Sequence, residues 1–199
     1  MHSRFLARVV IAAGALIAAA TAVLANPIVD PEGRYTGGAP LGRSPFSFLG
    51  GSSPVARTTV SFPGNHAPGT IVINTSERRL YYVNGDGTAI RYGIGVGRIG
   101  FTWAGTTAVS AKREWPDWTP PPQMLKRRPD LPRYMPGGPD NPLGARAMYL
   151  GSSLYRIHGS NEPETIGQAV SSGCFRLTND DVIDLYGRVR VGAKVIVLR

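Results

Sequence analysis

Short apolar runs separated by turn residues follow one another from about residue 68 onward. Residues 70–74 and 80–83 are rich in β-branched and aromatic side chains, and residues 75–77 between them suit a turn. Residues 84–87, Asn-Gly-Asp-Gly, are typical of a tight hairpin connection. The pattern therefore predicts strands joined by short loops.

Further runs of this kind continue to the end of the chain. Glycines alternate with apolar residues over 90–96, which is typical of a strand that another backbone or a ligand approaches closely. Four more runs have strand character: residues 106–112, 147–150, 155–158 and 194–198. The chain is therefore predicted to be mainly β, a β-sandwich or barrel-like domain with one or two short helices.

One helix is predicted shortly after residue 177. Thr178 followed by Asp181 fits a capping box, in which the threonine hydroxyl caps the first turn. Apolar side chains then share one helical face: Val182, Leu185, Tyr186 and Val189. The pattern is that of an amphipathic helix in a β-rich domain.

The N-terminus has the order of a secretory signal. Arg4 and Arg8 precede an uncharged apolar stretch over 9–25 that ends in small residues. Residues 1–25 are predicted to be a cleaved signal peptide. An uncleaved anchor is the alternative, since the stretch is only slightly short for a membrane span. In both cases the rest of the chain is expected outside the cytoplasm, without stable membrane insertion once the signal is removed.

Composition divides the remainder into two parts. Residues 26–66 are rich in Pro, Gly and Ser and show no sustained hydrophobic period, so they are predicted to be a flexible tether. Residues 67–199 carry the predicted elements and are long enough for one domain with a good core.

The formal net charge is +9, but the basic residues are scattered and no nucleic-acid motif is present. Nucleic acid is therefore excluded as a partner, and an anionic wall polymer or headgroup surface is expected instead.

The candidate chemistry centres on Cys174, the only cysteine. Exported proteins usually pair their cysteines, so a single thiol is either buried and inert or retained for its reactivity. A reactive thiol needs an adjacent base, and His158 is the only histidine within residues 67–199. The amides of Gly173 and Cys174 are candidate donors to an oxyanion. A buried cysteine and an unrelated histidine remain the alternative at this point.

These residues stand in an order that resembles a known family. His158-Gly159, followed by Ser171-Ser172-Gly173-Cys174-Phe175-Arg176, is similar to the signature of L,D-transpeptidase (YkuD-type) catalytic domains. Residues 118–121, 137–144 and 147–150 resemble segments of the periplasmic branch of that family. The resemblance covers about residues 68–199. It departs at Ser172, where many members have a histidine that could tune the thiol.

The resemblance implies a periplasmic enzyme that acts on peptidoglycan stem peptides. Cys174 would be the nucleophile that forms a thioester with the stem, His158 would carry the proton, and the backbone carbonyl of Gly159 would orient His158. The acceptor would be the amine of a second stem, giving a 3→3 cross-link, or the amine of a protein. No cofactor and no metal are expected. Two alternatives stay open: an L,D-carboxypeptidase that uses water, and a wall-binding module without turnover.

Several neighbouring residues have two interpretations each. Arg176 could hold a stem carboxylate through its planar fork, or it could only pair with Asp180 or Asp181 at the start of the predicted helix. The hydroxyl of Ser172 could donate to substrate or only stabilise its turn. The segment with Trp115, Trp118 and the prolines at 120–122 could cover the substrate cleft or plug an open end of the core. The plug is slightly favoured.

Overall fold

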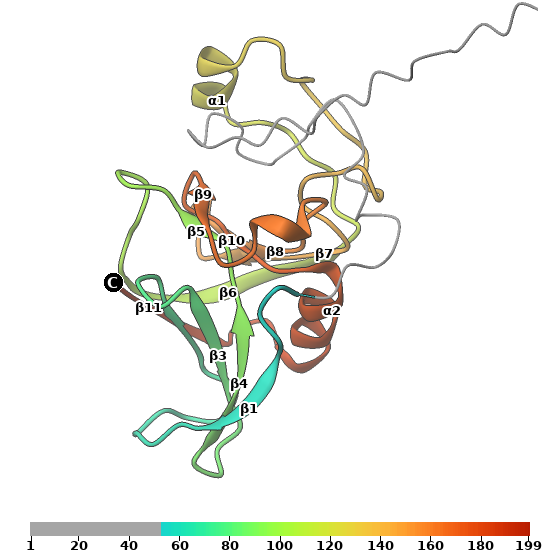
Figure 1. The fold of residues 1–199 in the computed structure, drawn as a ribbon. Coiled ribbons are helices and arrows are strands. Elements are labelled where there is room, and N and C mark those ends of the chain that lie inside the picture. Colours follow the sequence, from blue (N-terminus) through green and yellow to red (C-terminus); the bar gives the residue numbers. More distant parts are fainter. Residues whose placement is uncertain (1–52) are drawn as a thin grey trace, which may run out of the picture.

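The computed structural model describes residues 53–199 (Figure 1). The predicted signal peptide at 1–25 and most of the predicted tether lie outside this range. Within residues 53–199, no helix combines the length and the apolar character needed to cross a membrane.

The domain is mainly β, as predicted, and is built on one large mixed sheet. Nine strands lie in the order β1-β4-β3-β2-β11-β6-β7-β8-β10, and β5 and β9 form a separate parallel pair. The strands are β1 (Thr58–Ser61), β2 (Ile71–Asn74), β3 (Arg79–Val83), β4 (Thr88–Gly93), β5 (Val96–Gly97), β6 (Gly105–Glu114), β7 (Arg146–Leu150), β8 (Arg156–His158), β9 (Ala169–Ser171), β10 (Phe175–Arg176) and β11 (Lys194–Leu198). The helices are α1 (Pro122–Arg127), the 3₁₀ helix η2 (Pro163–Thr165) and α2 (Asn179–Arg188).

The long strand β6 joins the two halves of the sheet. Its first residues pair with β11, and its later residues pair with β7. The register shifts between Val109 and Ala111, where the strand passes from one partner to the other. Irregularities of this kind bend a strand, so the sheet is divided into one arm of β1, β4, β3, β2 and β11 and another of β7, β8 and β10 (Figure 1).

The two arms enclose one hydrophobic core. Ile71, Ile73 and Leu80 from the first arm and Met148 and Ile157 from the second are fully buried in the same cluster. Helix α2 packs against β7 and adds its predicted apolar face to this cluster through Val182 and Leu185. The capping prediction is confirmed, because Thr178 Oγ1 accepts a hydrogen bond from the Asp181 N–H at 3.3 Å.

Two differences from the sequence-based prediction affect the site. Strand β1 lies inside the predicted tether, and it pairs with β4 along its whole length, so the folded unit begins before residue 67. The run over 90–96 is not one strand. Strand β4 ends at Gly93. Gly95 then exchanges two backbone hydrogen bonds of 2.9 Å with Arg176, which links the first arm to β10.

Candidate active site

The two strands β8 and β10 place four chemically active side chains on one face. They run parallel, with Arg176 opposite His158 and Phe175 opposite Ile157. Because side chains alternate along a strand, Arg156 and His158 share one face of β8, and Cys174 and Arg176 share the same face of this pair. Ile157 and Phe175 point the other way and belong to the hydrophobic core. The residues that could do chemistry are thus held by a rigid, buried backbone.

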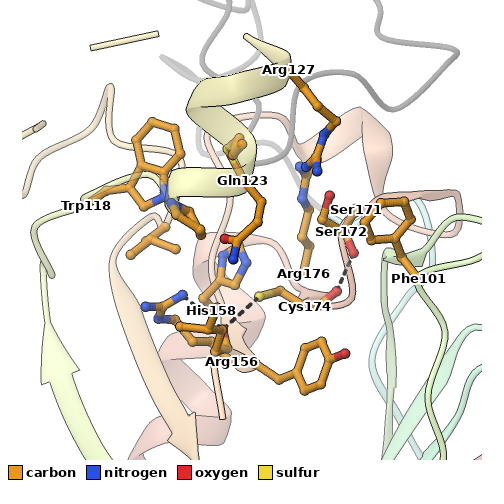
Figure 2. A pocket seen from close by; sticks show the side chains of 15 residues that line it. Phe101, Trp118, Gln123, Arg127, Arg156, His158, Ser171, Ser172, Cys174 and Arg176 are labelled. Carbon is orange, nitrogen blue, oxygen red and sulfur yellow. Dashed lines mark hydrogen bonds between the residues drawn. The ribbon is translucent and has the colours of Figure 1, made fainter. Parts of the chain in front are cut away.

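This face forms the floor of a cavity of about 360 Å³. Cys174, His158, Arg156 and Arg176 line it from the strands, and the segment that carries α1 covers it (Figure 2). The lining residues include three arginines, and no Asp or Glu lines the cavity among residues 53–199. The pocket is therefore suited to an anionic ligand.

The segment that covers the cavity has a small core of its own. Trp118, Met124, Leu131 and Leu143 form a second buried cluster, and Trp118 is only 3% exposed. Trp118 and Met124 also line the cavity. The two interpretations of this segment are therefore compatible, since the same residues form a packed plug and the wall of the pocket. Trp115 does not take part in this cluster and is 45% exposed.

Cys174 presents a half-buried free thiol at the start of β10. Its Sγ lies 3.8 Å from the carbonyl oxygen of Leu154. Burial raises the pKa of this thiol, while the positive charges and N–H groups of Arg156 and then the charge of Arg176 act in the opposite direction. The neutral thiol is therefore the resting form.

His158 is oriented by its own neighbour in the chain. Its Nδ1 lies 2.6 Å from the carbonyl oxygen of Gly159, and the ring is 2% exposed. A carbonyl can only accept, so Nδ1 carries the proton and Nε2 is left as the acceptor. Burial, helped by the charge of Arg176, lowers the pKa of His158 to about 3. The imidazole is therefore neutral at pH 7.

The hydrogen bond that the resemblance assigns to the Gly159 carbonyl is thus present. Glycine is also required at this position for packing. A Cβ on Gly159 would lie 2.4 Å from Oδ1 of Asn179, the atom that accepts the Ala145 N–H at 2.9 Å. The Gly159 peptide that bonds to His158 is itself fixed by Arg146, whose carbonyl accepts the Gly159 N–H at 3.0 Å.

The turn before Cys174 is organised by Ser171. Its hydroxyl donates to the Cys174 carbonyl at 2.6 Å and accepts the Gly173 N–H at 3.1 Å. The Gly173 N–H is therefore already engaged, contrary to the prediction that it serves as an oxyanion donor, and the Cys174 N–H remains as the candidate. The hydroxyl of Ser172 lines the cavity, and its oxygen is buried without a partner among the described residues.

Arg176 has a different partner from the two predicted. Its Nη1 lies 3.4 Å from Oε2 of Glu162, and the residue is 2% exposed. Asp181 instead pairs with Arg57 at 3.6 Å. The predicted pairing of Arg176 with Asp180 or Asp181 is wrong, since the partner comes from the residue that precedes η2. The second nitrogen, Nη2, is buried without a partner among residues 53–199.

Two residues of the site were not identified from the sequence. Arg156 lies two positions before His158, and a period of two along the predicted strand would have placed both on one face. Glu162 carries no comparable pattern, because its role depends on the fold of the loop after β8. No group of three or more His, Cys, Asp and Glu side chains that could hold a metal ion occurs among residues 53–199.

Comparison with known proteins indicates one family for this chain. A family model described as the L,D-transpeptidase catalytic domain (YkuD) matches residues 68–197. The Escherichia coli K12 protein named probable L,D-transpeptidase ErfK/SrfK is 43% identical over 137 residues, which are 64% of this chain and 43% of that protein. The chain thus spans less than half the length of this relative.

Solved structures show the same fold. An L,D-transpeptidase from Mycobacterium smegmatis superposes with a TM-score of 0.55 at 19% identity, over 67% of this chain and 59% of that one. A Brucella melitensis structure described as a probable carnitine operon oxidoreductase is 47% identical, with a TM-score of 0.50 over 74% of this chain and 96% of that one. That name concerns the Brucella protein alone. From the extent of the family match, the chain belongs to the L,D-transpeptidase catalytic domain (YkuD) family.

Proposed function

We propose that this protein is a peptidoglycan L,D-transpeptidase that works through a thioester on Cys174. The observation that carries the proposal is the shared face of β8 and β10, with a thiol and an imidazole whose Nε2 is free to accept a proton. Nε2 of His158 takes the thiol proton as Sγ attacks the carbonyl carbon of the third residue of a donor stem.

The tetrahedral intermediate then collapses. The bond to the terminal D-residue breaks, its nitrogen leaves as an amine with the proton held by His158, and the stem remains on Cys174 as a thioester. The amine of an acceptor attacks this thioester, gives its proton to Nε2 and restores the thiol by way of His158. The Cys174 N–H is the backbone donor proposed for the oxyanion in both steps.

The protonation states of the site indicate when the proton moves. Burial favours the neutral thiol of Cys174 and the neutral imidazole of His158, so both groups are uncharged in the free enzyme at pH 7. The proton is therefore transferred during attack on the substrate and not before it. When the donor stem peptide binds, it excludes water from the cavity. Electrostatic interactions with the charges that develop on the thiol and the imidazole then become stronger.

The charge of the cavity supports a stem peptide as donor. Arg127 on α1, together with Arg156 and Arg176, gives the cavity an excess of positive charge. Guanidinium groups bind carboxylates in a planar, bidentate manner, and the unpartnered Nη2 of Arg176 has this geometry to offer. We place the protein in the periplasm, exported by residues 1–25, with an amine of a second stem or of a protein as acceptor.

Intact-mass spectrometry with a carbapenem tests the nucleophile. The wild-type chain should gain one covalent adduct. Cys174→Ala should gain none, and His158→Ala should react at least about tenfold more slowly, because general-base catalysis contributes that much or more. His66→Ala is the matched control and should behave as the wild type, since His66 lies outside the cavity. A folded, reduced wild-type protein that forms no adduct would favour a wall-binding module without turnover.

Incubation with a tetrapeptide stem then distinguishes the acceptors. A 3→3 cross-linked dimer supports the transpeptidase. Release of tripeptide alone, with an amine acceptor present in excess, would instead identify an L,D-carboxypeptidase that uses water.

A further inference from the structure

The guanidinium of Arg156 and the thiol of Cys174 meet at one carbonyl oxygen. Nη1 of Arg156 donates to the Leu154 carbonyl at 3.1 Å, and Sγ of Cys174 lies 3.8 Å from the same oxygen. The strand pairing adds a second link, because Phe175 pairs with Ile157, so the residues just before them, Cys174 and Arg156, lie at the same end of this parallel pair. The cation is therefore held beside the sulfur by the backbone of both strands.

Arg156 has no competing anion. Among the described residues no carboxylate pairs with it, and its Nε is buried without a partner. Its guanidinium also lies over the ring of Tyr149, with 5.1 Å between the guanidinium carbon and the ring centre. An aromatic face orients the cation without neutralising its charge.

The other groups that face Cys174 do not supply an equivalent charge. His158 on β8 is neutral, because burial lowers its pKa to about 3. Arg176 on β10 is paired with Glu162 at 3.4 Å, so much of its charge is compensated. Arg127 on α1 lies over the ring of Phe101, and its charge is not among those that shift the pKa of Cys174.

Tyr155 and Ser172 complete the surroundings of the thiol. Tyr155 stacks on Trp103, with 4.8 Å between the ring centres, and Ser172 offers a neutral hydroxyl. Neither carries a charge that could stabilise a thiolate. Among the described residues, Arg156 is therefore the cation that both lacks a paired carboxylate and acts on the pKa of Cys174.

We propose that Arg156 is the cation that stabilises the anionic sulfur of Cys174 and thereby sets the reactivity of the nucleophile. This rests on the proposed role of Cys174. In the resting state the thiol proton faces the Leu154 carbonyl, which the guanidinium also contacts. When the proton leaves, the carbonyl can no longer accept from the sulfur, and the N–H groups of Arg156 become its donors. The residue thus provides, in cationic form, the tuning group that Ser172 does not.

Alkylation of the thiol tests this role without any acceptor or stem peptide. The rate of reaction of the purified chain with iodoacetamide is measured from pH 6 to pH 10.5, and the displacement of the rising limb of this profile along the pH axis gives the change in the apparent pKa of Cys174. Arg156→Gln keeps a donor for Leu154 but removes the charge. We expect its apparent pKa to be higher by about one unit or more, with about tenfold slower alkylation at pH 7.

Two further variants make the result specific. Arg156→Lys keeps the charge and should alkylate within about threefold of the wild type at pH 7. Arg79→Met is the matched control and should leave the profile unchanged. Arg79, like Arg156, donates to backbone carbonyls of nearby residues, but it lies on β3, outside the cavity. Arg156→Met, which keeps the apolar stem over Tyr149, replaces the Gln variant if that protein does not fold.

Three outcomes would overturn the proposal. The first is a neutral variant whose pH profile matches the wild type. The second is an Arg156→Lys variant as slow as the neutral one, because charge would then not be the cause. The third is an equal shift in Arg79→Met. None of these results depends on transfer to an acceptor, so a failed transpeptidase assay and a failed role for Arg156 are separate findings.

Discussion

Acidification should destabilise this protein through one buried side chain, His158. The ring is 2% exposed, and burial with the nearby charge of Arg176 lowers its pKa from 6.5 to about 3. In the unfolded chain the imidazole returns to its ordinary pKa. Between these two values the unfolded state binds a proton that the folded state does not. The stability that the neutral imidazole contributes is therefore present at pH 7 and is lost as the pH falls below 6.5.

The size of the effect follows from the two pKa values. A pH of 4.5 is about two units below the pKa of the imidazole in the unfolded chain, so that imidazole is protonated. The imidazole in the folded protein is still mostly neutral at this pH. One pKa unit corresponds to about 1.4 kcal/mol, so the free energy of unfolding should fall by about 2.5 kcal/mol between pH 7 and pH 4.5. A folded pKa one unit higher than about 3 changes this figure little, because the folded group would still be mostly neutral at pH 4.5.

Urea unfolding at pH 7 and pH 4.5 measures this difference. The comparison is with His158→Asn, whose side-chain amide can still donate to the Gly159 carbonyl but does not titrate. The cost of the smaller side chain is the same at both pH values and cancels, as do the carboxylates common to both proteins. The wild type should lose about 2.5 kcal/mol more than the variant, and His66→Asn should follow the wild type. An equal loss in wild type and His158→Asn would refute the reasoning.

Two predictions concern stability away from the nucleophile. Removal of the charge that faces Arg176, in Glu162→Gln, should lower the free energy of unfolding by about 2–3 kcal/mol, since it leaves a cation that is 2% exposed without its anion. Glu164→Gln, an exposed change within η2, should cost less than about 0.5 kcal/mol in the same urea titration. Lys112 donates to the carbonyls of Tyr186 and Val189 at the end of α2, both at 2.6 Å. Lys112→Met should therefore cost about 2 kcal/mol, read from the same midpoints, whereas an unchanged midpoint would show that these contacts add nothing.

The sequence identified the reacting pair because the chemistry needs rare residue types. Only one cysteine is present, and only His158 could serve it within residues 67–199. Most strands were also predictable, since runs such as the one that became β2 are apolar and β-branched. The helix α2 was predictable because its cap and its apolar face are local features.

The elements that were missed depend on contacts between distant parts of the chain. β10 has two residues and β9 has three, so neither contains enough alternation to be recognised alone. Helix α1 is short and begins in a proline-rich segment, and it is stabilised by the buried Met124. Arg156 was missed as a site residue for a related reason. Its place in the site depends on the pairing of β8 with β10, which brings residues far apart in the sequence together.

The domain boundary and the partner of Arg176 both differ from the sequence-based interpretation, and Asp181 is involved in both. Residues before β1 were read as part of a tether, yet Arg57 pairs there with Asp181 at 3.6 Å and with Asp184 at 3.3 Å. Asp181 thus pairs with the segment before β1, while Arg176 pairs with Glu162.

This arrangement has a consequence for the active site. A carboxylate of α2 beside Arg176 would have tied the guanidinium to the helix, on the side of the core. Glu162 binds Nη1 alone, and Nη2 remains buried without a partner among the described residues. Arg176 is thus fixed in position by Glu162, while its Nη2 stays available to the carboxylate of the proposed stem peptide.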